Sequence, residues 1–263
     1  IYFLGIGGIG MSALARYFHS KGNMVSGYDK TPSPLTKKLE EEGILIHYED
    51  NPNLIPENID LVILTPAIPA DSLELDYLKK KHVKIIKRAQ VLGEISRQCK
   101  SIAVAGSHGK TTVTSLISYL LHYAQKPMSA FIGGIAKNIN SNVIIGDEND
   151  EIVVMEADEF DRSFHQLTPY ISIVTSIDAD HLDIYGDENQ VVEAFNQFVD
   201  KTLPDGVVIC NSKLPITTDR KKLTYGLEDA DVMARDVQVE DGMTKFSVVT
   251  KEGVNFGEYK MQL

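Results

Sequence analysis

Short apolar runs alternate with longer mixed segments along the first part of the chain. The predicted strands are Ile1–Leu4, Met24–Tyr28, Ile44–His47, Ile59–Leu64 and Lys84–Ile86. The predicted helices between and after them are Met11–Ser20, Leu35–Glu42, Ser72–Lys81 and Ala89–Gln98. Strands that alternate with helices are typical of a parallel sheet with crossover helices. We therefore predict an α/β, Rossmann-like domain over residues 1–98.

The strand and helix pattern restarts after this segment and changes near the end. Predicted strands are Ser101–Ala105, Ile152–Met155, Ile171–Thr175 and Val207–Cys210, and predicted helices are Thr111–Ala124 and Asn189–Lys201. From Val232 onward, alternating strands are separated by the turn signals Asp241-Gly242 and Glu252-Gly253. That pattern indicates an antiparallel meander along one edge of the sheet. We predict a second α/β domain over residues 99–263, of the P-loop ATPase type, with antiparallel strands near its end.

Composition and charge narrow the classes of protein. Hydrophobic residues make up 43% and charged residues 24% of the chain, as in soluble globular proteins. No apolar run is long enough for a membrane-spanning helix. The formal net charge is −11 (26 basic against 37 acidic residues), which argues against nucleic-acid binding. Only two cysteines, Cys99 and Cys210, are present, and this fits a reducing cytoplasm.

A first glycine loop, Gly5-Ile6-Gly7-Gly8-Ile9-Gly10, lies between a predicted strand and a predicted helix. Asp29 ends the next strand, at the spacing of a ribose-binding acid. Glycines allow a pyrophosphate to approach the backbone, and the helix N-terminus supplies N–H donors. Alone, this pattern predicts either NAD or another nucleotide diphosphate, or a glycine turn needed only for packing.

A second loop, Gly106-Ser107-His108-Gly109-Lys110-Thr111-Thr112, also joins a strand to a helix. It departs from the P-loop consensus because Val104 stands where the first glycine belongs. The features that bind phosphate remain: backbone donors, the Lys110 charge and the Thr111 hydroxyl for Mg²⁺. An NAD-dependent oxidoreductase does not need such a loop, and the second loop therefore argues against that function.

Acidic residues follow two later strands. Glu156-Ala157-Asp158-Glu159-Phe160-Asp161 comes after Ile152–Met155, where P-loop proteins hold the Mg²⁺ of ATP, and Glu156 is the first choice of ligand. Asp178-Ala179-Asp180-His181-Leu182-Asp183 comes after Ile171–Thr175. Acids with one histidine at this position predict a second cation site or a site that positions phosphate oxygens.

Taken together, these segments resemble the Mur ligases, and among them the members that add L-alanine to UDP-N-acetylmuramate. The segments that carry the resemblance are GIGGIGMSALAR (5–16), RAQVLGEISR (88–97), GSHGKTT (106–112), EADEFDRSF (156–164) and IDADHLDIYG (177–186). They cover the whole chain in order. The implied activity is that of an ATP-dependent ligase of peptidoglycan precursor synthesis, with ATP and Mg²⁺ as cofactors.

The resemblance also implies a role for each matching residue. Gly7, Gly8, Ile9 and Gly10 would line the diphosphate of the UDP-sugar, Asp29 would face the uridine, and Thr65 and Ala67 would border the nucleotide. The P-loop, from Gly106 to Thr112, would grip ATP; Thr111 and Glu156 would hold one Mg²⁺ and His181 a second. Ser163, the Gly133-Gly134 turn and Asn142 would lie near the muramyl group. Ser176 stands where many members have Asn, so the contact made from that position is open.

The chemistry implied is stepwise. The muramate carboxylate is phosphorylated by ATP to an acyl phosphate, and the amine of L-alanine displaces the phosphate. Lys110, Glu156 and His181 are the residues expected to support this reaction. Family members continue into a third domain beyond the position of Leu263, so we expect these 263 residues alone to bind nucleotides without appreciable turnover. The alternatives are an NAD-dependent oxidoreductase and a P-loop binding module without ligase activity. The sequence does not indicate the oligomeric state.

Overall fold

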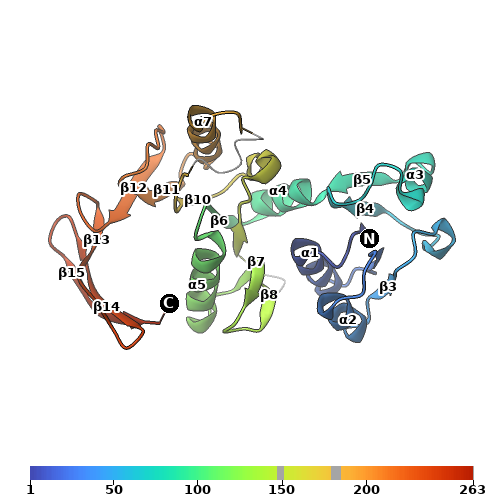
Figure 1. The fold of residues 1–263 in the computed structure, drawn as a ribbon, viewed down its shortest axis with the longest axis horizontal. Coiled ribbons are helices and arrows are strands. Elements are labelled where there is room, and N and C mark those ends of the chain that lie inside the picture. The colour runs from blue at the N-terminus through green and yellow to red at the C-terminus, as the bar shows by residue number, and fades with distance from the viewer. Residues whose placement is uncertain (147–150, 179–184, 263) are drawn as a thin grey trace. The chain divides into compact units, whose positions relative to one another are not determined.

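The computed structural model describes residues 1–146, 151–178 and 185–262 (Figure 1). Its internal contacts divide the chain into two compact units. The first unit comprises Ile1–Ser101 and Thr111–Glu156, and the second unit comprises Ile102–Lys110 and Ala157–Leu263. Each unit is described by itself below.

The first sheet has the strand order β3-β2-β1-β4-β5, and every neighbouring pair is parallel. Its strands are β1 (Tyr2–Leu4), β2 (Ser26–Tyr28), β3 (Leu45–His47), β4 (Leu61–Leu64) and β5 (Lys84–Lys87). The helices are α1 (Ile9–Ser20), α2 (Pro34–Glu41), η1 (Pro52–Leu54), α3 (Leu73–Lys80) and α4 (Arg88–Gln98). The order reverses direction at β1, so the loops after β1 and β4 meet at a switch point, where open α/β sheets bind ligands.

The second sheet has the order β15-β14-β13-β12-β11-β10-β6-β9-β7-β8 among the described strands. Its elements are β6 (Lys100–Ala105), α5 (Lys110–Tyr123), β7 (Met128–Ala136), β8 (Ser141–Ile144), β9 (Ile152–Glu156), η2 (Phe160–Gln166), β10 (Ile171–Val174), α7 (Glu188–Val199), β11 (Val207–Asn211), β12 (Lys221–Gly226), β13 (Val232–Glu240), β14 (Met243–Thr250) and β15 (Asn255–Met261). Strands β6 and β10–β13 pair in parallel, whereas β13, β14 and β15 form an antiparallel meander.

Within the first unit, the β7–β8 hairpin packs on helix α1. The buried side chain of Asn142 in β8 donates from Nδ2 to Ile9 O (2.6 Å) and to Ser12 Oγ (2.9 Å). The rings of Tyr17 and Phe131 meet edge to face with centroids 5.2 Å apart. A buried amide that bonds a helix end fixes the position of that end, because leaving such groups unpaired costs about 1–3 kcal/mol. The hairpin therefore holds the start of α1.

The predicted fold class is confirmed: a parallel, Rossmann-like sheet is followed by a mixed sheet with antiparallel strands near the end. Strands β7, β8 and β12 were not predicted. Gly133 and Gly134 belong to strand β7, so the prediction of a turn there is wrong. Strand β7 pairs with β9 and β8 on the N-terminal side of the glycines and with β8 again at Ala136, and the β7–β8 register shifts between Phe131 and Ala136. None of the helices that the structure describes has the length and apolar character needed to cross a bilayer.

Candidate functional site

The first glycine loop is tied to the end of strand β2. Gly5 and Ile6 both donate their backbone N–H to Tyr28 O, at 2.8 and 3.0 Å. Asp29 continues this contact: its Oδ2 accepts from Gly7 N at 2.7 Å, and its Oδ1 accepts from Thr31 N at 3.1 Å. The carboxylate of Asp29 thus shapes the loop through backbone hydrogen bonds.

The glycines of this loop are required for different reasons. A Cβ on Gly7 would lie 2.7 Å from Thr36 Cγ2, so packing within the protein excludes a side chain there. Gly8 is exposed, and the nearest heavy atom to a Cβ built on it, Gly5 O, is 3.7 Å away. Gly8 is also the N-cap of α1 and has an ordinary φ of −64°. Neither packing nor backbone strain therefore demands glycine at position 8, and the missing side chain leaves the backbone open to close approach.

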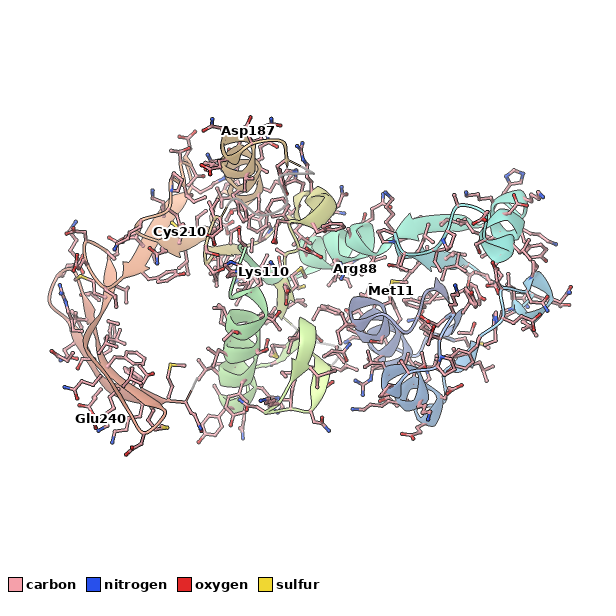
Figure 2. All side chains as sticks on the ribbon, in the orientation of Figure 1. Met11, Arg88, Lys110, Asp187, Cys210 and Glu240 are labelled. Atoms are coloured by element: carbon pink, nitrogen blue, oxygen red, sulfur yellow. The ribbon has the colours of Figure 1, made fainter. Side chains whose placement is uncertain are left out.

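Arg88 lies over the same loop, and sequence reasoning gave it no role. It is the first residue of α4 (Figure 2). Its guanidinium occupies the space that a Cβ on Gly10 would enter. Thr65, which follows β4, fills the corresponding space beside Gly5. Ala67 is exposed two residues later. A cation next to backbone N–H groups at a helix N-terminus forms an environment suited to a diphosphate.

The second loop belongs to the second unit up to Lys110. Gly106 and Gly109 adopt φ values of +143° and +81°, which favour glycine. Lys110 Nζ donates to Gly106 O at 2.6 Å and to Glu159 Oε1 at 2.8 Å. The side chains of this ion pair are 16% and 4% exposed for Lys110 and Glu159. Glu159 was recognised only as part of an acidic segment; its partner follows from the fold, because the loop after β9 faces the P-loop lysine.

The segment after β10 clamps the P-loop. Thr175 Oγ1 donates to His108 O at 2.5 Å, and Ser176 Oγ accepts from His108 N at 2.8 Å. Ser176 O accepts from Ser107 N at 3.1 Å, and Asp178 N donates to Ser107 Oγ at 2.9 Å. The sequence alone does not indicate what Ser176 contacts. In the structure it bonds directly to the P-loop backbone.

In the first unit, Thr111 and Glu156 meet at the start of α5 and the end of β9. Thr111 Oγ1 donates to Glu156 Oε2 at 2.9 Å, and the same oxygen accepts from Gly133 N at 2.9 Å. A hydroxyl and a carboxylate side by side match the hard oxygen ligands of Mg²⁺, which usually takes one or two carboxylates plus phosphates and water. Among the described residues, no group of three or more His, Cys, Asp or Glu side chains gathers into a metal cage. The arrangement fits a metal shared with nucleotide phosphates.

The structure places most of the remaining predicted residues, which do not gather at one point. His108 and Thr112 are exposed on the P-loop and the first turn of α5. Ser163 lies in η2 of the second unit, where its Oγ donates to Asp158 O at 2.9 Å. His181 lies outside the described residues. Asn142 is buried against α1 through the bonds given above.

Several proteins of known name are similar in sequence to this chain. The UDP-N-acetylmuramate–L-alanine ligase of Christiangramia forsetii is 44% identical over 256 residues, which are 95% of this chain and 55% of that protein. The enzyme of the same name from Parabacteroides distasonis is 47% identical over 262 residues, 96% of this chain and 56% of that protein. The chain thus spans about half the length of these curated relatives.

A solved structure and two family models cover the same residues. The crystal structure of UDP-N-acetylmuramate-alanine ligase from Thermotoga maritima has a TM-score of 0.86 at 28% identity, over 100% of this chain and 60% of that one. The model described as "Mur ligase family, catalytic domain" matches residues 1–100, and the "Mur ligase middle domain" matches residues 104–263. These matches show that the chain belongs to the Mur ligase family.

Proposed function

We propose that this chain holds the two anionic substrates of an ATP-dependent ligase that joins L-alanine to the carboxylate of UDP-N-acetylmuramate. The observation that carries the proposal is the occurrence of two phosphate-type glycine loops in one chain, each with its own cation, Arg88 beside the first and Lys110 in the second. The names of the relatives at 44% and 47% identity supply the substrates.

The P-loop is the proposed ATP site. Its backbone and Lys110 would bind the β- and γ-phosphates, with Gly106, Ser107, His108, Gly109 and Thr112 completing the loop. Thr111 and Glu156 would hold Mg²⁺, which when bound neutralises charge on the phosphates. His181 is proposed as a ligand of a second Mg²⁺ on the strength of the resemblance alone.

The first loop is the proposed site of the UDP-sugar. The N–H groups at Gly8, Ile9 and Gly10 and the guanidinium of Arg88 would face the diphosphate. Asp29 binds Gly7 N, and we propose that it sets the loop and borders the uridine. Thr65 and Ala67 would flank the nucleotide, and Ser163 would lie near the muramyl group.

The proposed reaction has two steps. An oxygen of the muramate carboxylate attacks the γ-phosphorus of ATP, and ADP leaves with the electron pair of the broken P–O bond. The amine of L-alanine then attacks the acyl carbon, phosphate leaves, and the amine loses a proton. The first step brings two anions together and the second places a neutral amine against the acyl phosphate, so the contribution of the protein is positioning and charge neutralisation. Lys110, the first residue of α5, would supply positive charge for this.

We also propose a domain boundary, a cellular compartment and a biological role for this chain. We place the domain boundary between residues 98 and 99, the enzyme in the cytoplasm, and its role in cell-wall biogenesis, with neither nucleic acid nor membrane insertion involved. Both cysteines, Cys99 and Cys210, are free thiols. The acidic surplus of −11 is consistent with small anionic substrates being bound by local loops, not by the general surface charge.

Titration calorimetry tests the proposal. UDP-N-acetylmuramate and ATP with Mg²⁺ are expected to bind at separate sites, each without competition from the other, and NAD is expected not to displace the sugar nucleotide. NAD binding that is tighter than UDP-N-acetylmuramate binding would contradict the assignment. In the full-length protein, phosphate release should require L-alanine and the sugar nucleotide together; release that is independent of both would leave only a P-loop hydrolase or binding module.

A further inference from the structure

The ion pair between Lys110 and Glu159 is largely buried. The carboxylate of Glu159 is 4% exposed, and the Lys110 ammonium beside it is 16% exposed. The ammonium has three protons, and its acceptors are Gly106 O at 2.6 Å, Glu159 Oε1 at 2.8 Å and Ser107 O at 3.5 Å. The protein itself thus provides an acceptor for each of the three N–H donors of the ammonium. A phosphate that binds Lys110 must share it with these acceptors or replace one of them.

Glu159 is held in place independently of the lysine. The hydroxyl of Tyr185, a fully buried residue, donates to Glu159 O at 2.5 Å. The guanidinium of Arg162 lies over the Tyr185 ring, 5.2 Å from its centroid. Because the backbone of Glu159 is anchored in this way, its carboxylate stays near the P-loop when Lys110 moves. A fixed negative charge then lies close to the place where the β- and γ-phosphates of the nucleotide would bind.

We propose that Glu159 is a positioning residue that competes with nucleoside triphosphate for Lys110. This inference rests on the proposed ATP site. Glu159 neutralises the lysine within the protein and orients its ammonium toward Gly106. The same carboxylate weakens the binding of a triphosphate, because the phosphates must draw the lysine away from it and also lie near its negative charge. A nucleoside monophosphate does not reach Lys110 and is insensitive to this competition.

The test compares ATP with AMP by titration calorimetry on the full protein. Glu159→Gln keeps the shape of the side chain and removes its charge. We expect this variant to bind ATP more tightly by about tenfold or more, since the charge-assisted hydrogen bond that competes for Lys110 is weakened. AMP affinity should stay within about twofold, because no competing charge is involved. The matched control is Glu252→Gln, which removes the same charge from an exposed turn between β14 and β15 and should change neither affinity.

A second pair of variants tests whether the effect passes through the lysine. In a Lys110→Met background, Glu159→Gln should alter ATP affinity by much less than in the wild-type background. Equal effects in both backgrounds would overturn the proposal, as would a Glu159→Gln variant whose preference for ATP over AMP is unchanged or lower. Wild-type protein that shows no preference for ATP over AMP would instead contradict the proposed ATP site.

A measurement on the wild-type protein remains available if Glu159→Gln does not fold. The carboxyl carbon NMR signal of Glu159 reports on its hydrogen-bond partner. It should shift when ATP is added and stay in place when AMP is added. If the signal does not shift with either nucleotide although ATP binds, the proposed competition is contradicted.

Discussion

Thr111 Oγ1 donates a hydrogen bond to Glu156 Oε2 at 2.9 Å, and this contact joins the first turn of α5 to the end of β9. Gly133 N holds the same carboxylate oxygen from the neighbouring strand β7. The carboxylate of Glu156 is therefore oriented by a backbone N–H on one side and by a hydroxyl on the other, and neither contact depends on a metal. Orientation of this kind matters for metal ligands, and losing it commonly lowers metal affinity.

Replacing Thr111 by Val should reduce the Mg²⁺-dependent part of ATP affinity by at least about tenfold, since a ligand and the orienting bond to Glu156 are lost together. Thr111→Ser keeps the hydroxyl and should retain most of the affinity. The measurement is ATP titration with Mg²⁺ and with EDTA. Equal binding by the Val and Ser variants in Mg²⁺ would show that the hydroxyl is not a ligand.

Replacing Gly8 by Leu should impair UDP-sugar binding while the protein stays folded, because a Cβ at this exposed position meets nothing in the protein nearer than 3.7 Å. Steric overpacking costs about 1–3 kcal/mol, which corresponds to a rise in Kd of roughly fivefold to 150-fold. ATP affinity should be unchanged. Gly7→Ala is the contrasting variant: its Cβ would lie 2.7 Å from Thr36 Cγ2, so thermal stability should fall.

A Gly8→Leu protein that loses both ligands equally would contradict the assignment of two separate sites. So would a variant that binds UDP-N-acetylmuramate with wild-type affinity.

Arg88 should contribute to diphosphate binding through charge and through its planar fork. Arg88→Met should weaken UDP-N-acetylmuramate binding by about tenfold or more, the size expected for a charge-assisted hydrogen bond. Arg88→Lys should give an intermediate loss, because the charge remains and the bidentate geometry does not. Wild-type affinity should fall with added salt more steeply than that of the Met variant. Identical salt dependence in the two proteins would remove Arg88 from the diphosphate site.

Glu74 should make the first unit less stable as the pH rises. It is 0% exposed, accepts from Tyr2 OH at 2.5 Å and from Asn51 N at 3.0 Å, and lies 3.5 Å from His47 Nε2. Burial is the main cause that raises the pKa of Glu74 above 4.5, although both hydrogen bonds act in the opposite direction. The folded state therefore binds this proton more tightly than the unfolded state does. Its stabilising contribution is complete below pH 4.5 and is lost as the pH rises through the folded pKa.

Urea unfolding of wild type and of Glu74→Gln, followed from pH 4.5 to pH 7, measures this contribution. The free energy of unfolding of the wild type should fall relative to that of the Gln variant over this range. Parallel pH profiles would show that Glu74 has the same pKa in the folded and unfolded states.

The strand and helix order of both sheets follows from the hydrophobic pattern, because buried parallel strands are continuous apolar runs with helices between them. Strands β7, β8 and β12 were missed for reasons that can be named. β7 contains two adjacent glycines, β8 has only four residues, and β12 begins with two exposed lysines. Their strand conformation depends on pairing with distant segments, which local propensity does not report.

The candidate site also contains residues that can be selected from the sequence and residues whose contacts appear only in the fold. The glycine loops, Lys110 and Thr111 were selected from motif spacing, and Glu156 from its place at the end of a strand; their functional roles stay predictions. Arg88, Glu159 and Ser176 act through contacts made by the fold. An acidic segment with several carboxylates does not reveal which one reaches the lysine, and an arginine at a helix start does not reveal that it covers Gly10.

The Asn142 side chain has a consequence for dissecting this protein by truncation. It comes from strand β8, within the segment matched by the middle-domain model, yet its amide is bonded to Ile9 and Ser12 in the segment matched by the other model. A polypeptide cut after residue 100 would leave the α1 surface around Ser12 without its buried amide. Such a piece should melt at a lower temperature and exchange the amide protons of α1 faster than the same helix does in the longer chain. The boundary between the two homologous modules and the boundary between the two compact units thus fall at different places in the sequence.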